Sequence, residues 1–174
     1  WESTSGSLQH TFDDFLTRVW SARFSPDGET LTTTTRDRVS FWDLATGEEG
    51  PTWIKGEGIT KQSRYLPDGT QLLTVGGSEH VRGWGLAPEL EGRYLEGHHA
   101  EVNGVRFSPD GTWLASTGGH WKEGGDGRVL LWQPGRTMES GSATAHHVLE
   151  GGQRWTHPLA FHPDGKEVSA GDNK

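Results

Sequence analysis

The chain has 174 residues, with 16 Lys and Arg against 24 Asp and Glu and a formal net charge of −8. An acidic chain of this kind has no basic stripe to neutralise a phosphate backbone, so nucleic acid and anionic membrane surfaces are not expected as default partners. The absence of Cys excludes disulfides and thiolate metal sites. The composition favours short strands around buried aromatic rings over long helices, because it includes 26 Gly, 8 Pro, nine Trp and six Phe.

The first predicted element is a hairpin whose turn reads Phe-Ser-Pro-Asp-Gly at residues 24–28. A closely related turn recurs at 65–69, 107–111 and 161–165. Pro presets φ for the first central position of a turn, Asp can accept from the backbone ahead, and Gly supplies a positive φ. Each copy therefore predicts two antiparallel strands joined by a tight turn.

Two further strands follow each hairpin in most of the units. In the third unit the first strand carries Val102, Val105 and Phe107, and the second carries residues 113–115. The third strands, each closed by a Trp, lie at 39–42, 81–84 and 129–132, and the fourth strands lie around 50–54, 92–96 and 146–150. Four antiparallel strands every 42 residues or so are typical of a propeller blade.

The third unit resembles the WD-repeat β-propeller family. It reads Leu-Glu-Gly-His-His-Ala-Glu-Val at 95–102 and Asp-Gly-Arg-Val-Leu-Leu-Trp at 126–132, with the hairpin turn at 107–111 between them. These residues carry the Gly-His, Asp-Gly and Trp motifs of the family in order, and Trp42 with Asp43 supplies the Trp-Asp dipeptide itself.

The resemblance implies an all-β propeller of four-stranded antiparallel blades that occupies residues 1–174 as a single segment. Its units lie at about 1–42, 43–84, 85–132 and 133–174, and they make three complete blades plus one split blade that lacks its third strand. Two explanations of this incomplete ring stay open. We favour a slice of a larger ring; the alternative is a homodimer in which two copies pair their open blade edges into an eight-blade ring.

Only the third unit offers the hydrogen-bonded tetrad of the family, which the resemblance assigns to His98, Ser116, Asp126 and Trp132. In that arrangement the Asp accepts from the His, the His bonds the hydroxyl, and the hydroxyl meets the indole N–H. The first two units keep the hydroxyl and the Trp but place Phe15 and Gly56 at the His position and Arg36 and Ser78 at the acid position. Those blades should be looser.

Nine His invite a metal hypothesis, above all at the adjacent pairs His98-His99 and His146-His147. Adjacent residues of a strand point to opposite faces, so such a pair cannot easily chelate one ion. We therefore expect neither a metal site nor another cofactor.

Catalysis is not expected either. Ser116 with His98 and Asp126 superficially resembles a catalytic triad, but the family resemblance ties this hydroxyl to Trp132 and packs it between blades. The sequence contains no Gly-x-Ser-x-Gly elbow and no His-Glu-x-x-His motif. We expect a protein that is not an enzyme.

Binding is the remaining function. In the family, the positions where the first strands begin surround the top of the central channel, a surface called here the strand-start face, and they commonly contact partners. The loop at 118–125 carries an insertion on the same face, and a second insertion within 133–145 lies on the opposite one. The predicted contact residues are Arg18, Trp20, Lys61, Glu101, Asn103, His120, Trp121, Trp155 and His157.

Exposed Trp and Arg often dominate interface energies, which favours a protein or peptide partner. The function predicted is therefore a non-catalytic scaffold within a larger signalling or regulatory protein; the alternative is a propeller that stacks a small molecule or glycan on the same aromatic rings. No apolar run reaches the roughly 18 residues of a transmembrane span and no secretory leader precedes Trp1, so a cytoplasmic location is expected.

Overall fold

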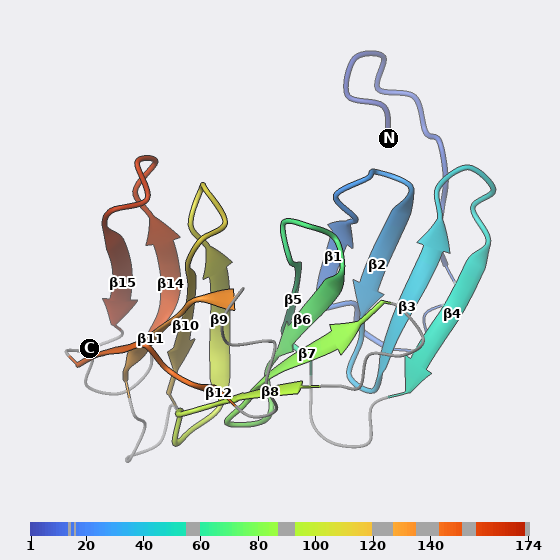
Figure 1. Ribbon diagram of the computed structural model, residues 1–174. Coiled ribbons are helices and arrows are strands. Elements are labelled where there is room, and N and C mark those ends of the chain that lie inside the picture. The colour runs from blue at the N-terminus through green and yellow to red at the C-terminus, as the bar shows by residue number, and fades with distance from the viewer. Residues whose placement is uncertain are drawn as a thin grey trace.

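The chain forms an open arc of β-sheets (Figure 1). The computed structural model describes residues 1–13, 15, 17–54, 60–86, 93–119, 127–134, 143–150 and 156–172. Within these ranges lie three antiparallel sheets of four strands each, one antiparallel pair, and a short fifth strand on the second sheet. This architecture confirms the predicted all-β class with four-stranded blades.

The first two sheets follow the chain order strand by strand. The first sheet consists of β1 (Ser21–Phe24), β2 (Thr30–Thr34), β3 (Arg38–Asp43) and β4 (Glu49–Ile54). The second consists of β5 (Gln62–Tyr65), β6 (Gln71–Val75), β7 (Val81–Gly85) and β8 (Arg93–Glu96).

The third sheet departs from this order only at its outer edge. It contains β9 (Val102–Phe107), β10 (Leu114–Gly118), β11 (Val129–Trp132) and β13 (His147–Leu149), and the fourth sheet contains β14 (Thr156–Phe161) and β15 (Val168–Asp172). Between β11 and β13, the strand β12 (Ala143–Thr144) pairs in parallel with β8 of the second sheet. The sequence placed an insertion here but did not predict this strand.

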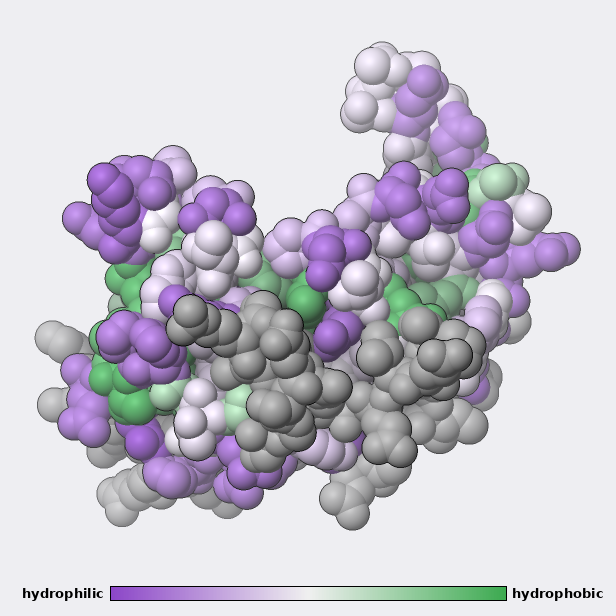
Figure 2. All heavy atoms as spheres, viewed as in Figure 1, coloured by the Kyte–Doolittle hydropathy of each residue, from purple (hydrophilic) through white to green (hydrophobic). Residues whose placement is uncertain are grey.

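The first strands of the four sheets lie side by side along the inner edge of the arc (Figure 1). Three apolar clusters fill the spaces between successive sheets. The largest lies between the second and third sheets and includes Leu73, Val105 and the fully buried Trp132. Figure 2 shows the resulting pattern, with hydrophobic residues between the sheets and hydrophilic ones over the hairpin turns.

The hairpin turns also contact one another from sheet to sheet. The Gly of each turn has a φ between 72° and 76° and donates its N–H to the carbonyl three residues earlier. A Cβ built on Gly69, Gly111 or Gly165 would lie within 4 Å of the ring of the preceding turn's Pro. The repeated motif therefore shapes each turn and also stacks it on the previous one.

The N-terminal segment lies at one end of the arc and the C-terminus at the other (Figure 1). Residues 1–13 contain no strand, and the rings of Phe12 and Phe15 pack on Trp42, with centroids 5.1 Å and 5.4 Å away. The first sheet thus has an aromatic cover on its outer side. In the described residues no helix is long and apolar enough to cross a membrane.

Candidate interaction surface

The third sheet has a buried polar core whose side chains already engage one another in hydrogen bonds. Ser116 Oγ lies 2.8 Å from His98 Nε2 and accepts the indole N–H of Trp132 at 2.9 Å. His98 is 3% exposed, and Ser116 and Trp132 are fully buried. The structure thus brings together three members of the predicted tetrad; Asp126 lies outside the described residues.

The first two sheets keep half of this arrangement. Trp42 Nε1 donates to Thr33 Oγ1 and Trp84 Nε1 donates to Thr74 Oγ1, each at 2.8 Å. In the first sheet the ring of Phe15, which occupies the His position of the motif, packs edge-on against Trp42. An aromatic contact therefore stands where the third sheet has a hydrogen bond.

On the strand-start face, three of the predicted contact residues form one cluster across the second and third sheets. Lys61 Nζ lies 2.7 Å from Glu101 Oε2 and donates to Asn103 Oδ1 at 2.9 Å. Asn103 is fully buried and donates its own amide N–H to the carbonyl of Gly119 at 2.7 Å. Since the side chains of Lys61 and Glu101 are 25% and 38% exposed, this ion pair is the part of the cluster that a partner can reach.

Arg18 and Trp20 form a second group on the same face. The guanidinium carbon of Arg18 lies 5.3 Å from the ring centroid of Trp20, a distance at which a cation is attracted to the ring face. Trp20 stays 42% exposed although its backbone N–H is held by the carbonyl of Thr34 at 2.8 Å. Trp20 is therefore an exposed aromatic side chain on a backbone that is held by a hydrogen bond.

Part of the predicted contact set cannot be placed. His120, Trp121 and Trp155 lie outside the described residues, and His157 lies on β14 with no described side chain. Within the described part of the chain, no hydrogen bond, ion pair or ring contact joins the Arg18–Trp20 pair to the Lys61 cluster. The strands that follow the two groups, β1 and β5, are in contact.

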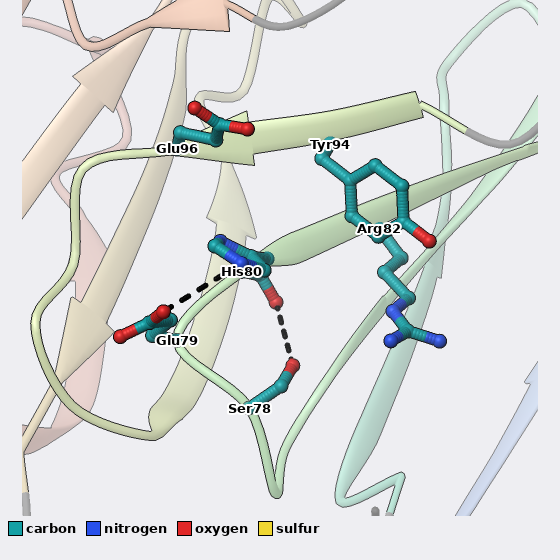
Figure 3. A pocket seen from close by; sticks show the side chains of 6 residues that line it. All are labelled: Ser78, Glu79, His80, Arg82, Tyr94 and Glu96. Carbon is teal, nitrogen blue, oxygen red and sulfur yellow. Dashed lines mark hydrogen bonds and ion pairs between the residues drawn. The ribbon is translucent and has the colours of Figure 1, made fainter. Parts of the chain in front are cut away.

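A hollow of about 530 Å³ on the second sheet was missed by sequence reasoning (Figure 3). It is lined by Ser78, Glu79, His80, Arg82, Tyr94 and Glu96. Arg82 is the pairing neighbour of Tyr94 and lies over its ring at 5.2 Å, without a hydrogen bond to its buried Nε. Comparison of the repeat units could have indicated this hollow, because Arg82 stands at the position where the third sheet has the buried Leu130.

The adjacent His146 and His147 differ from the sequence expectation. Their rings lie 4.6 Å apart and both pack on Trp113, at 5.4 Å and 5.8 Å between centroids. The alternation of side chains does not apply here, because β13 begins only at His147 and the chain bends at His146. Among the described residues there is no group of three or more His, Asp or Glu placed to hold a metal ion.

The sheets and the hydroxyl–Trp pairs agree with what comparison with known proteins finds. A family model described as WD domain, G-beta repeat matches residues 6–43 and 91–133. These two regions of the chain are WD repeats. The chain is also similar to eukaryotic translation initiation factor 3 subunit I of Aspergillus terreus, with 33% identity over 76 residues that cover 43% of this chain and 22% of that protein. The matched part thus spans about a fifth of that relative. WD repeats support a general role in protein interaction.

Proposed function

We propose that this WD-repeat chain is a non-catalytic platform that binds a protein or peptide on its strand-start face, as part of a larger signalling or regulatory protein. The observation that carries the proposal is the pair of Arg18 and the exposed Trp20 on that face. Trp and Arg are enriched among residues that dominate binding energies, and a Trp held on a fixed backbone loses little entropy when it is covered.

The Lys61–Glu101 ion pair extends the proposed surface to the second and third sheets. His120, Trp121, Trp155 and His157 complete it as predicted members. The name of the Aspergillus relative supports a protein partner, since that protein is a subunit of a translation initiation factor. Burial of Ser116 supports a role without catalysis, because its hydroxyl is occupied by Trp132 and His98 inside the sheet.

Affinity capture from cell extract with three forms of the chain tests this proposal. We expect Trp20→Ala to reduce recovery of a specific protein by at least about tenfold, the loss typical of a dominant interface residue. Phe24→Ala is the matched control, because Phe24 is 67% exposed at the far end of β1, the strand that begins directly after Trp20. Equal recovery with wild type and Trp20→Ala would contradict the surface; a Trp20-dependent signal on a glycan array would favour the carbohydrate alternative.

A further inference from the structure

Three arginines occupy one register position on three neighbouring first strands. Each stands directly before the aromatic residue that begins the hairpin-turn motif. In the fourth sheet this position is Ala160. Because β1 contacts β5 and β5 contacts β9, the three positions lie in a row along the inner edge of the arc. This arginine row consists of Arg23, Arg64 and Arg106.

The three side chains share one conformation. The NH1 group of each donates to the backbone carbonyl of the residue before it, at 2.6 Å for Arg23, 2.9 Å for Arg64 and 2.8 Å for Arg106. All three residues are half-buried. A bond to the chain's own backbone uses one of the five N–H groups of a guanidinium and leaves the others for another acceptor.

The positive charge of this row is not neutralised by the described part of the chain. Among the described residues, the one further bond of the row is the donation from Arg106 to Gln62 Oε1 at 2.9 Å, which crosses from the third sheet to the second and brings no negative charge. Burial, and next to it the charge of Arg106, lower the pKa of Arg23. Three like charges held together in a chain of net charge −8 indicate a place for a counter-ion.

We propose that the arginine row binds a compact oxyanion of the phosphate class that carries at least two negative charges. Three guanidinium groups from three strands offer more donors than the two oxygens of a single carboxylate can accept. A phosphate group presents three oxygens at nearly double the charge, and planar guanidinium groups match its geometry. The site differs from the proposed partner surface, since the row lies toward the hairpin turns, at the other end of the first strands.

Titration with pyrophosphate tests the inference on the full chain, by calorimetry and by the Arg Nε–H resonances in the nitrogen-15 NMR spectrum. We expect saturable binding that shifts three Arg resonances in the wild type. Arg64→Ala gives the centre of the row the residue type that the fourth sheet has there, at Ala160. This variant should bind pyrophosphate at least about tenfold more weakly. Arg82→Ala is the matched control, because Arg82 is also half-buried but lies outside the row.

The controls separate a binding role from a structural one. Absence of any shift in the wild type at millimolar pyrophosphate overturns the proposal, as does equal binding by Arg64→Ala. Equal or tighter binding of the tricarboxylate tricarballylate at the same ionic strength overturns the phosphate class. Tighter binding of a phosphoserine peptide than of pyrophosphate supports that class and assigns its source to a phosphorylated partner, whereas the reverse order assigns it to a small molecule.

Discussion

Each hairpin-turn glycine meets two requirements at the scale of one residue. Its positive φ closes the turn, and its missing side chain makes room for the turn before it. The second requirement differs among the copies. A Cβ on Gly111 would lie 2.7 Å from Pro67 Cγ, whereas a Cβ on Gly28 would have no neighbour within 4 Å. In the described residues, no copy of the turn packs against Gly28.

The pair Gly111→Ala and Gly28→Ala separates these requirements. Both variants bear the strain of an alanine at positive φ, which costs roughly 1–2 kcal/mol. We expect Gly111→Ala to lower the free energy of unfolding by about 1–3 kcal/mol more than Gly28→Ala, because Pro67 must also move. Urea unfolding of the two variants measures the difference. Equal losses in the free energy of unfolding would show that packing of Pro67 against the next turn does not restrict the residue at position 111.

The turn aspartates give the protein an acid-sensitive component. The Ser25 hydroxyl lowers the pKa of Asp27, the Ser108 hydroxyl lowers that of Asp110, and the Lys166 backbone N–H lowers that of Asp164. A carboxyl whose pKa is lower when folded stabilises the native state above its unfolded pKa. That stabilisation is lost as the pH falls through the folded pKa.

We therefore expect stability to fall below about pH 4, the range in which Asp carboxyls take up protons. The variant with Asn at positions 27, 110 and 164 should be less stable at neutral pH and should lose less on acidification. Urea midpoints measured from pH 7 down to pH 2 test this expectation. A triple variant with the same acid dependence as the wild type would assign the effect to other groups.

At the scale of one element, the third sheet has the most complete internal polar core. One hydroxyl, Ser116 Oγ, serves both Trp132 and His98, while in the first sheet Thr33 serves Trp42. The sequence predicted this difference because the motif residues are local and spaced by strand register. The contact between Ser116 and Trp132 follows once β10 pairs with β11.

Ser116→Ala should lower the free energy of unfolding by at least about 2 kcal/mol, because it removes a buried partner from two groups at once. Thr33→Val, which removes the partner of Trp42 alone and keeps the shape of the side chain, should cost about 1 kcal/mol. Chemical unfolding followed by tryptophan fluorescence measures both. Equal losses would mean that the His98 contact adds nothing to the Trp132 contact.

The strand β12 could not be predicted from the sequence. Residues 143–144 pair in parallel with β8, a partner nearly fifty residues earlier in the chain. A two-residue strand has no periodicity of its own. Only the packing of Ala143 into the core between the second and third sheets places it there.

At the scale of the whole molecule, the arc leaves an edge. In the described residues β15 pairs only with β14, so one row of its backbone groups has no strand partner. An unpaired edge strand readily adds another strand. The slice and homodimer interpretations both give this edge a partner in the complete assembly.

We expect the isolated chain to associate through β15 in a concentration-dependent manner. Light scattering on a size-exclusion column should give masses that rise above 19.1 kDa with loading. Ala170→Lys places a charge on the exposed edge and should return the chain toward the monomer. A constant mass of twice 19.1 kDa would instead support paired half-rings, and a constant monomer would contradict association through this edge.

The sequence by itself determined the number of hairpins, the four-strand period, the Trp–hydroxyl pairs and the WD repeats. Each of these depends on residues within one unit, where turn chemistry and strand alternation act over a few positions. Tertiary structure alone decided that Lys61 holds Glu101 and Asn103, that Arg82 lines a hollow, and that Arg23, Arg64 and Arg106 form a row. The contacts of Lys61 and of the arginine row join residues about forty positions apart, and their distances depend on how neighbouring sheets pack, which no local pattern encodes. The hollow lies within the second sheet and depends on how β7 pairs with β8.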